Sequence, residues 1–284
     1  MARLIVNADD FGLTSGVNRA IAELHRAGVL TSATLMAKAA ATDEAIEIAR
    51  ATPTLGVGCH VVLVDGEPVL SARNEIPNVA DPAFEQFHPS LLGLLDSLYR
   101  YWPRMKHTAR QIEAEASAQI ALLQGRGLRL THIDTHKHTH MFPRVLRPVL
   151  RAARAAGIRA VRNPFEPAWS VRATPGAPWL RRMQVGVLRR LERSFRRIVA
   201  EEGFVTTDGA IGVLATGTLD APTITSLLRG LQAGTWELVT HPGYNDAGLG
   251  AVRTRLRETR QIELEALAAL QQFPHIERVS FADL

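Results

Sequence analysis

Cysteine is nearly absent from this 284-residue chain. The single Cys59 allows no internal disulfide and is typical of a reducing compartment, so we expect a cytoplasmic protein. No run of about 18 uncharged apolar residues is present, which argues against a transmembrane helix. The first ten residues, MARLIVNADD, have only a short apolar stretch before two aspartates. We therefore expect no secretory signal.

Lysine is also scarce. Of 33 basic residues only three are lysines, so arginine supplies nearly all of the positive charge, and the net charge is +5. The arginine excess has two interpretations: genome composition, or an anionic partner such as nucleic acid, a phospholipid surface or an acidic substrate. No zinc finger, P-loop or aromatic RNA-binding motif is present, so we expect no nucleic acid partner.

Hydrophobic residues make up 46% of the chain, which is enough for a packed core and excludes disorder over most of its length. Apolar runs with the length of strands alternate with segments of helical periodicity. Helices are expected at 14–28, capped by Thr14 or Ser15 and followed by Gly28, and at 42–51, 90–100 and 108–125. Strands are expected at 3–8, 30–36, 54–63, 129–134, 158–162, 210–215, 236–240 and 277–281.

This alternation predicts parallel strands joined by right-handed crossovers. The number of units, and the lack of a GxGxxG motif after the first strand, favour a barrel over a dinucleotide-binding sheet. The fold class is therefore α/β, a TIM-like (β/α) barrel, distorted or with seven strands. We expect a single domain over 1–284, with an inserted basic amphipathic segment at about 165–205.

Chemistry in such a barrel sits at the carboxyl ends of the strands. Polar side chains follow most of the expected strands at that point. Convergence of these side chains at one barrel mouth is the central expectation. They are Asp9 and Asp10, His60, the histidines of the segment 132–140, Arg162 and Asn163, and His241.

Residues 132–140, HIDTHKHTH, hold four histidines in nine positions. Histidine is seldom a core filler and is the commonest neutral metal ligand. His132 and His136 would share a helical face, whereas His136, His138 and His140 would share one face of an extended segment. Not all of them can bind one ion, and His136 is our choice of ligand. The alternative is a polar loop or a histidine-rich surface tract.

Asp9 and Asp10 follow the first strand and point in different directions, so one carboxylate can bind a metal while the other faces substrate. The alternative is a turn or a helix cap. His60 would supply a third ligand, although a lone histidine in an apolar strand is more often a hydrogen-bonded core residue. One aspartate and two histidines suit a catalytic divalent ion that keeps a position for water. We expect one ion, zinc first, with magnesium, manganese, cobalt, nickel or iron(II) as alternatives.

Two further residues are candidates for catalysis. His241 opens the turn THPGYND and could act as a general acid, since imidazole titrates near neutral pH. Its alternative is a turn histidine without a role. Arg162 could hold a carboxylate through two hydrogen bonds, or could be one more surface arginine.

NADDFG near the amino terminus, the strand of His60, the segment DTHKH and the turn THPGY resemble, in this order, the motifs of the YdjC-like carbohydrate deacetylase family. They spread over about residues 3–245. The resemblance implies a barrel related to the polysaccharide deacetylases, with a metal bound by Asp10, His60 and His136. It also implies Asp9 as the general base and His241 as the acid.

The chain departs from the family pattern at two triplets. Gly58-Cys59-His60 stands where the family often has GLH, and Asp134-Thr135-His136 stands where it has DSH or NAH. Both keep the histidine. CHVVLVDGEPVL, THKHTH and the region 95–120 are similar to a branch associated with hopanoid biosynthesis. This similarity implies removal of acetate from an N-acetylglucosaminyl lipid, and we assign substrate contact to His138, His140, Asn163 and Tyr244.

Residues 178–199 form a basic amphipathic pattern, with apolar residues every three or four positions and seven arginines against Glu192. One interpretation is a barrel helix with a solvated basic face. The other is an interfacial helix on an anionic membrane surface, which would place the protein peripherally at the inner membrane face. The expected membrane contacts are Trp179, Arg189, Arg190, Arg193 and Phe195, and Trp169 also suits such a boundary.

Three functional classes follow. The first is a metal-dependent N-deacetylase. The second is another metal-dependent barrel hydrolase, acting on a lactone, a phosphoester or a cyclic amide. The third is a non-catalytic lipid-binding or nucleic-acid-binding protein, which leaves the pairing of Asp9 and Asp10 with His136 unexplained. The sequence leaves the oligomeric state open.

Overall fold

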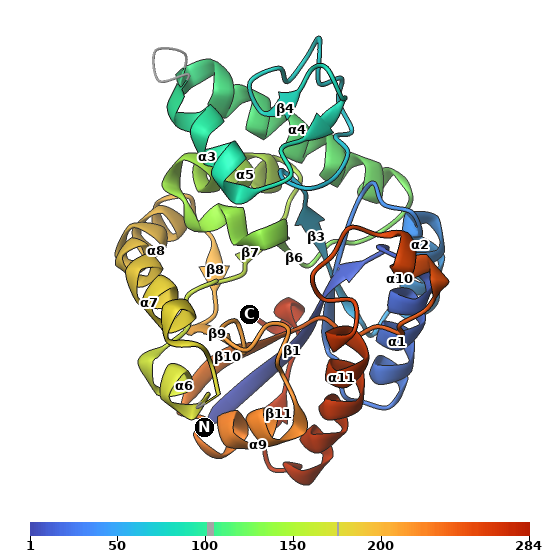
Figure 1. The fold of residues 1–284 in the computed structure, drawn as a ribbon, viewed down its shortest axis with the longest axis vertical. Coiled ribbons are helices and arrows are strands. Elements are labelled where there is room, and N and C mark those ends of the chain that lie inside the picture. Colours follow the sequence, from blue (N-terminus) through green and yellow to red (C-terminus); the bar gives the residue numbers. More distant parts are fainter. Residues whose placement is uncertain (101–104, 175) are drawn as a thin grey trace.

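The computed structural model describes residues 1–100, 105–174 and 176–284. Eight parallel strands curl into a nearly closed barrel with helices around it (Figure 1). Their order is β8-β7-β6-β3-β2-β1-β10-β9, and β11 pairs with β1 outside this path. The strands are β1 (Ala2–Phe11), β2 (Ser32–Leu35), β3 (Gly56–Val61), β6 (His132–Thr135), β7 (Ala160–Val161), β8 (Val205–Thr206), β9 (Gly209–Ile211), β10 (Gly234–Thr240) and β11 (Glu277–Arg278).

Helices connect most successive strands and cover the outside of the barrel, whereas β8 leads directly into β9 (Figure 1). No helix of the described residues combines the length and apolar character needed to cross a bilayer. The helices are α1 (Ser15–Arg26), α2 (Thr42–Ala51), α3 (Leu91–Arg100), α4 (Met105–Gly125), α5 (Pro143–Ala155), α6 (Ala168–Ala173), α7 (Trp179–Leu188), α8 (Glu192–Glu201), α9 (Ala221–Arg229), α10 (Ala247–Ala251) and α11 (Thr259–Ala266). Short 3-10 turns are η2 (His136–Met141), η3 (Arg189–Leu191), η4 (Leu267–Gln272) and η5 (Phe281–Asp283).

The predicted α/β barrel is confirmed, and each expected strand has a counterpart in the sheet. Helix α1 begins after Thr14, whose hydroxyl accepts from the Val17 amide at 3.3 Å, and it is followed by Gly28 at φ 69°. The sequence interpretation missed strand β8. It also missed the antiparallel hairpin of β4 (Ala80–Asp81) and β5 (Gln86–Phe87), in a stretch taken as irregular. Two-residue strands are too short to leave a periodic pattern.

The barrel is open between β8 and β9, the two ends of the strand order. Residues following β7 bridge this seam. The Phe165 carbonyl accepts from the Ala210 amide at 3.2 Å, and the Asn163 side chain donates to the Thr207 carbonyl at 3.2 Å. These bonds satisfy backbone groups that a regular strand pair would otherwise satisfy, so the curvature of the sheet is held without full closure.

The interior of the barrel is polar, unlike the branched aliphatic filling that is usual in TIM barrels. Strand residues two apart face the same side, and the inward positions of β1, β2, β3, β6 and β10 hold buried polar groups. Ile5, Ala160 and Phe281 form a small apolar cluster apart from the main core. The main hydrophobic core instead lies between the strands and the helices. The inward polar groups are Asn7, Asp9, Ser32, Thr34, His60, His132, Asp134 and Glu237.

Strand β3 shows this division of faces within two residues. His60 belongs to the polar interior, whereas Cys59 is fully buried in the core outside the barrel. Burial, together with the charge of Asp134, raises the pKa of the Cys59 thiol far above its ordinary value. The thiol is therefore protonated and inert while the strand is in place.

Gly58 is required by the packing of the interior. A Cβ at this position would lie 2.5 Å from the His132 ring, which stacks on Phe281 with ring centroids 3.8 Å apart. The ring lies between Gly58 and Phe281 and has no space to retreat.

We therefore expect Gly58→Ala to lower the free energy of unfolding by about 1–3 kcal/mol, the usual penalty for overpacking. Urea denaturation followed by circular dichroism measures the change. Gly125→Ala, at the end of α4, where an added Cβ meets nothing within 4 Å, is the matched control and should be neutral or stabilising. Equal stability of the Gly58→Ala protein and the native chain would contradict this packing argument.

Candidate metal centre and active site

Asp9 and Asp10 both reach the barrel mouth because strand β1 is irregular at this point. The pairing register between β1 and β2 shifts between Ala8 and Phe11, and Asp10 has a left-handed backbone with φ 63°. In a regular strand the two side chains would point to opposite faces. The irregularity turns Asp10 toward the strand ends, and such strained residues cluster at functional sites.

Asp10, His60 and His136 converge on one point, and we call them the acid–histidine cluster. Asp10 Oδ1 lies 3.1 Å from His136 Nδ1 and 3.4 Å from His60 Nε2. The two histidine nitrogens are 3.3 Å apart. Asp10 Oδ1 is buried and has no hydrogen-bond partner among the described residues. Three stretches distant in sequence thus present three ligand atoms in a near-equilateral triangle.

These distances fit a metal ion. A tetrahedral zinc with bonds of about 2.0–2.1 Å has ligand-to-ligand edges of about 3.3 Å, and the triangle has edges of 3.1, 3.3 and 3.4 Å. A buried carboxylate oxygen that no N–H group satisfies is also what a cation requires. The donor set of one carboxylate and two imidazoles suits zinc and its neighbours among the first-row metals.

His60 is held in the orientation that a metal needs. Its Nδ1 donates to Asp134 Oδ1 at 2.7 Å, which directs Nε2 toward Asp10. This carboxylate–histidine arrangement is the usual support behind a metal-binding imidazole. Burial lowers the pKa of His60, but the neighbouring carboxylates of Asp134 and Asp10 more than offset it and raise the value to about 10. The local field therefore favours positive charge at this position.

Asp9 lies beside the cluster, with a carboxylate oxygen within 4.8 Å of a His60 nitrogen, and is held by Arg162. The guanidinium donates to both carboxylate oxygens of Asp9, at 2.6 and 2.8 Å, and to Glu237 Oε1 at 2.8 Å, and it also contacts Asp134. Burial raises the pKa of Asp9, but Arg162 more than offsets this and holds it well below the ordinary value. Asp9 therefore stays ionised at neutral pH.

Arg162 is fully buried, so it is not a surface arginine. The carboxylates that Arg162 binds are side chains of the protein itself and not groups of a substrate. Arg162 lies beside the candidate catalytic groups, as predicted. It contacts the side chains of Asp9 and Asp134 and is not exposed to solvent. Arg162 is therefore a positioning residue for both halves of the site.

His241 completes the mouth on the side of β10. Its Nε2 lies 3.7 Å from Asp9 Oδ2, and its Nδ1 lies 3.8 Å from Glu263 Oε2. Glu263 also accepts from the His241 amide at 2.6 Å, which fixes the loop, whereas the ring Nδ1 has no hydrogen-bond partner among the described residues. Burial raises the pKa of Glu263 above its ordinary value, and the nearby His241 offsets only part of this rise.

Sequence reasoning missed three supporting residues. Glu237 interrupts the apolar run of β10, and a charged residue at that position could have marked an inward-facing group. Arg260, which donates to Asp10 Oδ2, and Glu263 lie three apart on α11 and are both buried. No local signal distinguishes them from other charged residues of a helix, because their role depends on where α11 packs.

The histidine-rich segment does not continue as a strand. Strand β6 ends at Thr135, and η2 begins at His136, with left-handed residues Lys137 and His138 at φ 54° and 52°. The expectation that His136, His138 and His140 share one extended face is therefore wrong. A turn directs His136 to the cluster and sends the later histidines elsewhere.

The residues expected to contact substrate differ in exposure. His140 is fully buried, and its ring nitrogens bond Thr135 Oγ1 at 2.7 Å and the Arg162 carbonyl at 3.2 Å. Asn163 is also buried, with its oxygen accepting from the Phe165 amide at 3.1 Å while its amide bridges the seam. Both expectations are corrected, because neither side chain has a free polar group at the mouth.

His138 and Tyr244 remain candidates for substrate contact. His138 is half-buried, and its Nδ1 has no hydrogen-bond partner in the described part of the chain. Burial, with the charge of Arg162, lowers its pKa to about 3, so the ring is neutral. Tyr244 is half-exposed, donates to Glu23 and lies under the Arg19 guanidinium at 3.9 Å.

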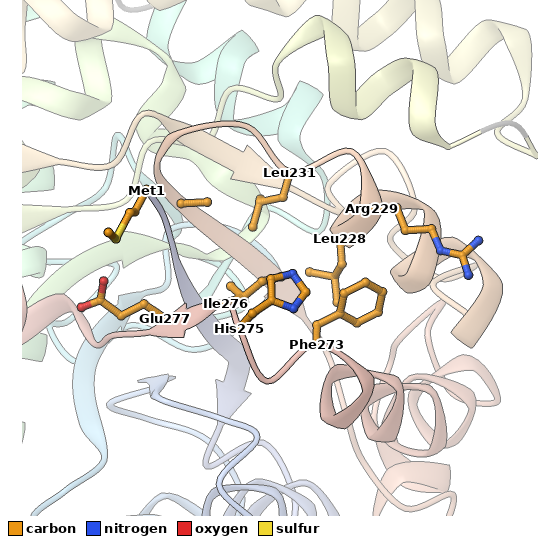
Figure 2. Close-up of a pocket in the computed structure, with 9 residues that line it drawn as sticks. Met1, Leu228, Arg229, Leu231, Phe273, His275, Ile276 and Glu277 are labelled. Carbon is orange, nitrogen blue, oxygen red and sulfur yellow. The ribbon is translucent and has the colours of Figure 1, made fainter.

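A pocket of about 470 Å³ lies at the other end of the barrel (Figure 2). Its wall combines the start of β1 with the end of α9 and the chain that leads into β11. The acid–histidine cluster contributes no residue to it, so this pocket is separate from the site described above. Its lining includes Met1, Leu228, Leu231, Phe273, His275 and Ile276.

The expectation that Phe195 contacts a membrane is wrong. Its side chain is fully buried and packs edge-to-face on Phe165, with ring centroids 5.5 Å apart. Trp169 is also buried, against Trp236. Trp179 is exposed, as are Arg190 and Arg193, whereas Arg189 is half-buried. Residue 175, within the expected insertion, lies outside the described residues.

A parallel barrel with carboxylates and histidines at the carboxyl ends of its strands defines an α/β-barrel protein with a candidate metal centre. The YdjC-like protein family model matches residues 3–273, and the chain belongs to that family. A carbohydrate deacetylase of Brevibacillus brevis is 31% identical over 99% of both chains. A human carbohydrate deacetylase is 32% identical over 85% of this chain and 75% of its own length.

Solved structures share this fold. A protein of Enterococcus faecalis described as a cellobiose-phosphate cleavage protein superposes with a TM-score of 0.73, at 25% identity over 99% of this chain and 98% of its own. A lactam utilization protein of Thermus thermophilus superposes with a TM-score of 0.50 at 13% identity, over 98% of this chain and 99% of its own. The second likeness concerns the fold alone.

The acid–histidine cluster predicts that Asp10→Ala loses bound metal, because one of three ligand atoms is removed. We expect at least a tenfold drop in zinc retained after dialysis, measured by elemental analysis. Asp43→Ala removes an exposed carboxylate paired with Arg126 and is the control, which should retain the native metal content. Unchanged metal content in Asp10→Ala would exclude Asp10 as a ligand.

Glu237 predicts a pH dependence of stability. Burial raises its pKa from 4.5 to about 7, although Arg162 opposes the shift. Because the folded state holds the proton more tightly, ionisation of Glu237 costs stability as pH rises from about 4.5 to about 7. Glu237→Gln removes this cost, so its stability relative to the native chain should rise over that range and level off above it.

Urea midpoints at several pH values from about 5 to about 8 test this dependence. Glu277→Gln, at an exposed position on β11, is the matched control and should show no such trend. A constant difference between the Glu237→Gln and native proteins across the range would contradict the assignment.

Proposed function

We propose that this protein is a carbohydrate deacetylase that hydrolyses the N-acetyl group of an amino sugar with the help of a divalent metal. The observation that carries the proposal is the near-equilateral triangle of Asp10 Oδ1, His60 Nε2 and His136 Nδ1 at the barrel mouth. Membership of the YdjC-like family and the carbohydrate deacetylases among its relatives support the reaction class.

Asp10, His60 and His136 would hold the metal, which would polarise an amide carbonyl and lower the pKa of a bound water. Asp134 holds His60 through Nδ1, so that Nε2 faces the cluster, and Arg260 keeps Asp10 directed toward the cluster. These contacts fix the ligand atoms before substrate arrives, so little free energy is spent on reorganisation during the reaction.

Asp9 is the proposed general base. It stays ionised, so it can take a proton from the attacking water. The bidentate bond from Arg162 lowers its basicity, and a lowered pKa of the water would compensate for this loss. Arg162 also prevents Asp9 from rotating toward the cluster and becoming a ligand.

His241 is the proposed general acid. It lies across the mouth, with Nε2 3.7 Å from Asp9 Oδ2. A proton on Nε2 could pass to the departing sugar amine, which is a poor leaving group when unprotonated. Glu263 anchors the backbone of His241 and lies 3.8 Å from the opposite side of the ring, so the acid and the base face one another across the mouth.

The proposed substrate is the N-acetylglucosaminyl group of a hopanoid glycolipid, met at the inner face of the membrane. The similarity of CHVVLVDGEPVL and THKHTH to the hopanoid-associated branch of the family supports this choice. His138 and Tyr244 would contact the sugar.

Acetate release from an N-acetylglucosaminyl compound tests the proposal. The zinc-loaded protein should release acetate, and a chelator should stop the release until zinc is restored. Asp9→Asn should keep its metal and lose about 10²–10⁴-fold in kcat, because the amide cannot accept the proton. Asp43→Asn, at an exposed aspartate, is the control.

An unchanged kcat in Asp9→Asn would exclude Asp9 as the base while leaving the activity itself intact. Absence of acetate release by the zinc-loaded protein, with turnover of a lactone, a phosphoester or a cyclic amide, would replace the deacetylase with another barrel hydrolase.

A further inference from the structure

Helix α7 presents its apolar side to solvent. Trp179, Leu180, Met183 and Val187 are 72%, 50%, 53% and 56% exposed, and α7 has no buried residue. Because residues three, four and seven apart share a helical face, these side chains form one stripe, which we call the α7 stripe. An amphipathic helix that packs on a barrel normally buries such a stripe.

The opposite side of α7 explains this orientation. Arg181 donates to the Thr216 carbonyl at 2.7 Å, and Arg182 donates to the Val171 and Ala177 carbonyls at 2.8 and 3.2 Å. Both arginines are half-buried. Bonds from charged donors to backbone carbonyls are strong, so they fix the polar side of the helix against the protein. The apolar stripe is therefore held outward.

Positive charge follows directly along the chain. Turn η3 has no buried residue, and helix α8 buries Phe195, Ile198 and Val199 and leaves its arginines on the outer side. Within the described residues, the exposed Arg190 and Arg193 make no ion pair. Glu192 is the one acidic residue of 178–199. Arg190 lies three residues after Val187 and seven after Met183, which places it on the side of the stripe.

The α7 stripe lies near the catalytic mouth. Helices α6 and α7 belong to the connection from β7 to β8, which leaves the barrel at the carboxyl ends of the strands, and α7 lies beside α8 on one flank (Figure 1). Arg181 bonds the carbonyl of Thr216, and the next amide, that of Gly217, donates to Glu263 at 3.3 Å. Glu263 in turn holds His241, so two short links join the stripe to the site.

We propose that the α7 stripe and the adjacent arginines form a surface that docks on an anionic lipid bilayer, with the apolar side chains in the interface and Arg190 and Arg193 at the lipid phosphates. Apolar residues beside unpaired arginines match such a surface in both polarity and charge. A second copy of this chain is disfavoured, because a symmetric contact would bring the same arginines together. This inference does not depend on the proposed function, since it concerns lipid association and not turnover.

Co-sedimentation of the full chain with vesicles tests the surface. We expect binding to phosphatidylglycerol–phosphatidylcholine vesicles and weaker binding to phosphatidylcholine alone. The double variant Met183→Ser/Val187→Ser should bind at least about tenfold more weakly, because apolar area is lost from the interface. Arg190→Gln/Arg193→Gln should lose about fivefold per arginine, with the loss reduced at high salt.

Two controls carry matched changes elsewhere. Leu92→Ser removes another exposed apolar side chain, from α3, and Arg129→Gln removes an exposed arginine. Both should bind vesicles like the native chain. All variants should keep native circular dichroism and native activity on a small soluble N-acetyl sugar.

Failure of the native chain to bind anionic vesicles, or equal binding by the stripe variants, would overturn the proposal. Self-association that Met183→Ser/Val187→Ser abolishes, in the absence of vesicle binding, would assign the stripe to a second copy instead. If the native chain binds anionic vesicles but releases no acetate from an N-acetyl sugar, the result would count against the proposed function and not against the lipid-binding surface.

Discussion

Compensation of buried negative charge by Arg162 is the constraint on which the site depends. Asp9, Asp134 and Glu237 come from three strands of the barrel interior, and each contacts this one guanidinium. Carboxylates packed so closely would repel one another and take up protons without a cation between them. Removing a partner from such a buried network commonly costs about 3–5 kcal/mol. The polar interior exists because one buried arginine holds it together, and the same contacts aim Asp9 and, through Asp134, His60.

One backbone irregularity separates the two proposed tasks of the site. The register shift of β1 and the left-handed Asp10 allow neighbouring aspartates to face different partners at the same mouth. Asp10 meets two imidazoles and Arg260, whereas Asp9 meets Arg162 and His241. A ligand and a base a single residue apart need this arrangement, because a regular strand would send one of them into the hydrophobic layer outside the barrel. The left-handed backbone of Asp10 is therefore what allows one aspartate to face the candidate metal site while its neighbour faces His241.

The sequence contained enough to predict the barrel, the main strands and the convergence of polar side chains at one mouth, because apolar periodicity and polar residues at strand ends are local signals. The choice of Asp10 over Asp9 as the ligand beside His60 and His136 came from the family resemblance. It could not show that Lys137 and His138 turn the chain, since left-handed residues other than glycine leave no pattern. Glu263 and Arg260 were missed because their partners lie far away in sequence. The basic segment was interpreted with one apolar side, but its halves face opposite ways: Phe195 points to the core while Met183 points to solvent. Only the bonds of Arg181 and Arg182 to distant carbonyls determine that difference.

Alkylation of the single Cys59 thiol can report on local opening of the structure around β3. The thiol sits on the strand that carries His60, behind the acid–histidine cluster, and its pKa is raised by burial. An alkylating reagent can reach it only when the packing around β3 opens, so the labelling rate measures local opening around this strand together with any global unfolding. Because β3 carries one of the candidate ligands, a bound ion should slow alkylation in proportion to its affinity, and occupancy could be followed in unmodified protein without a spectroscopic metal.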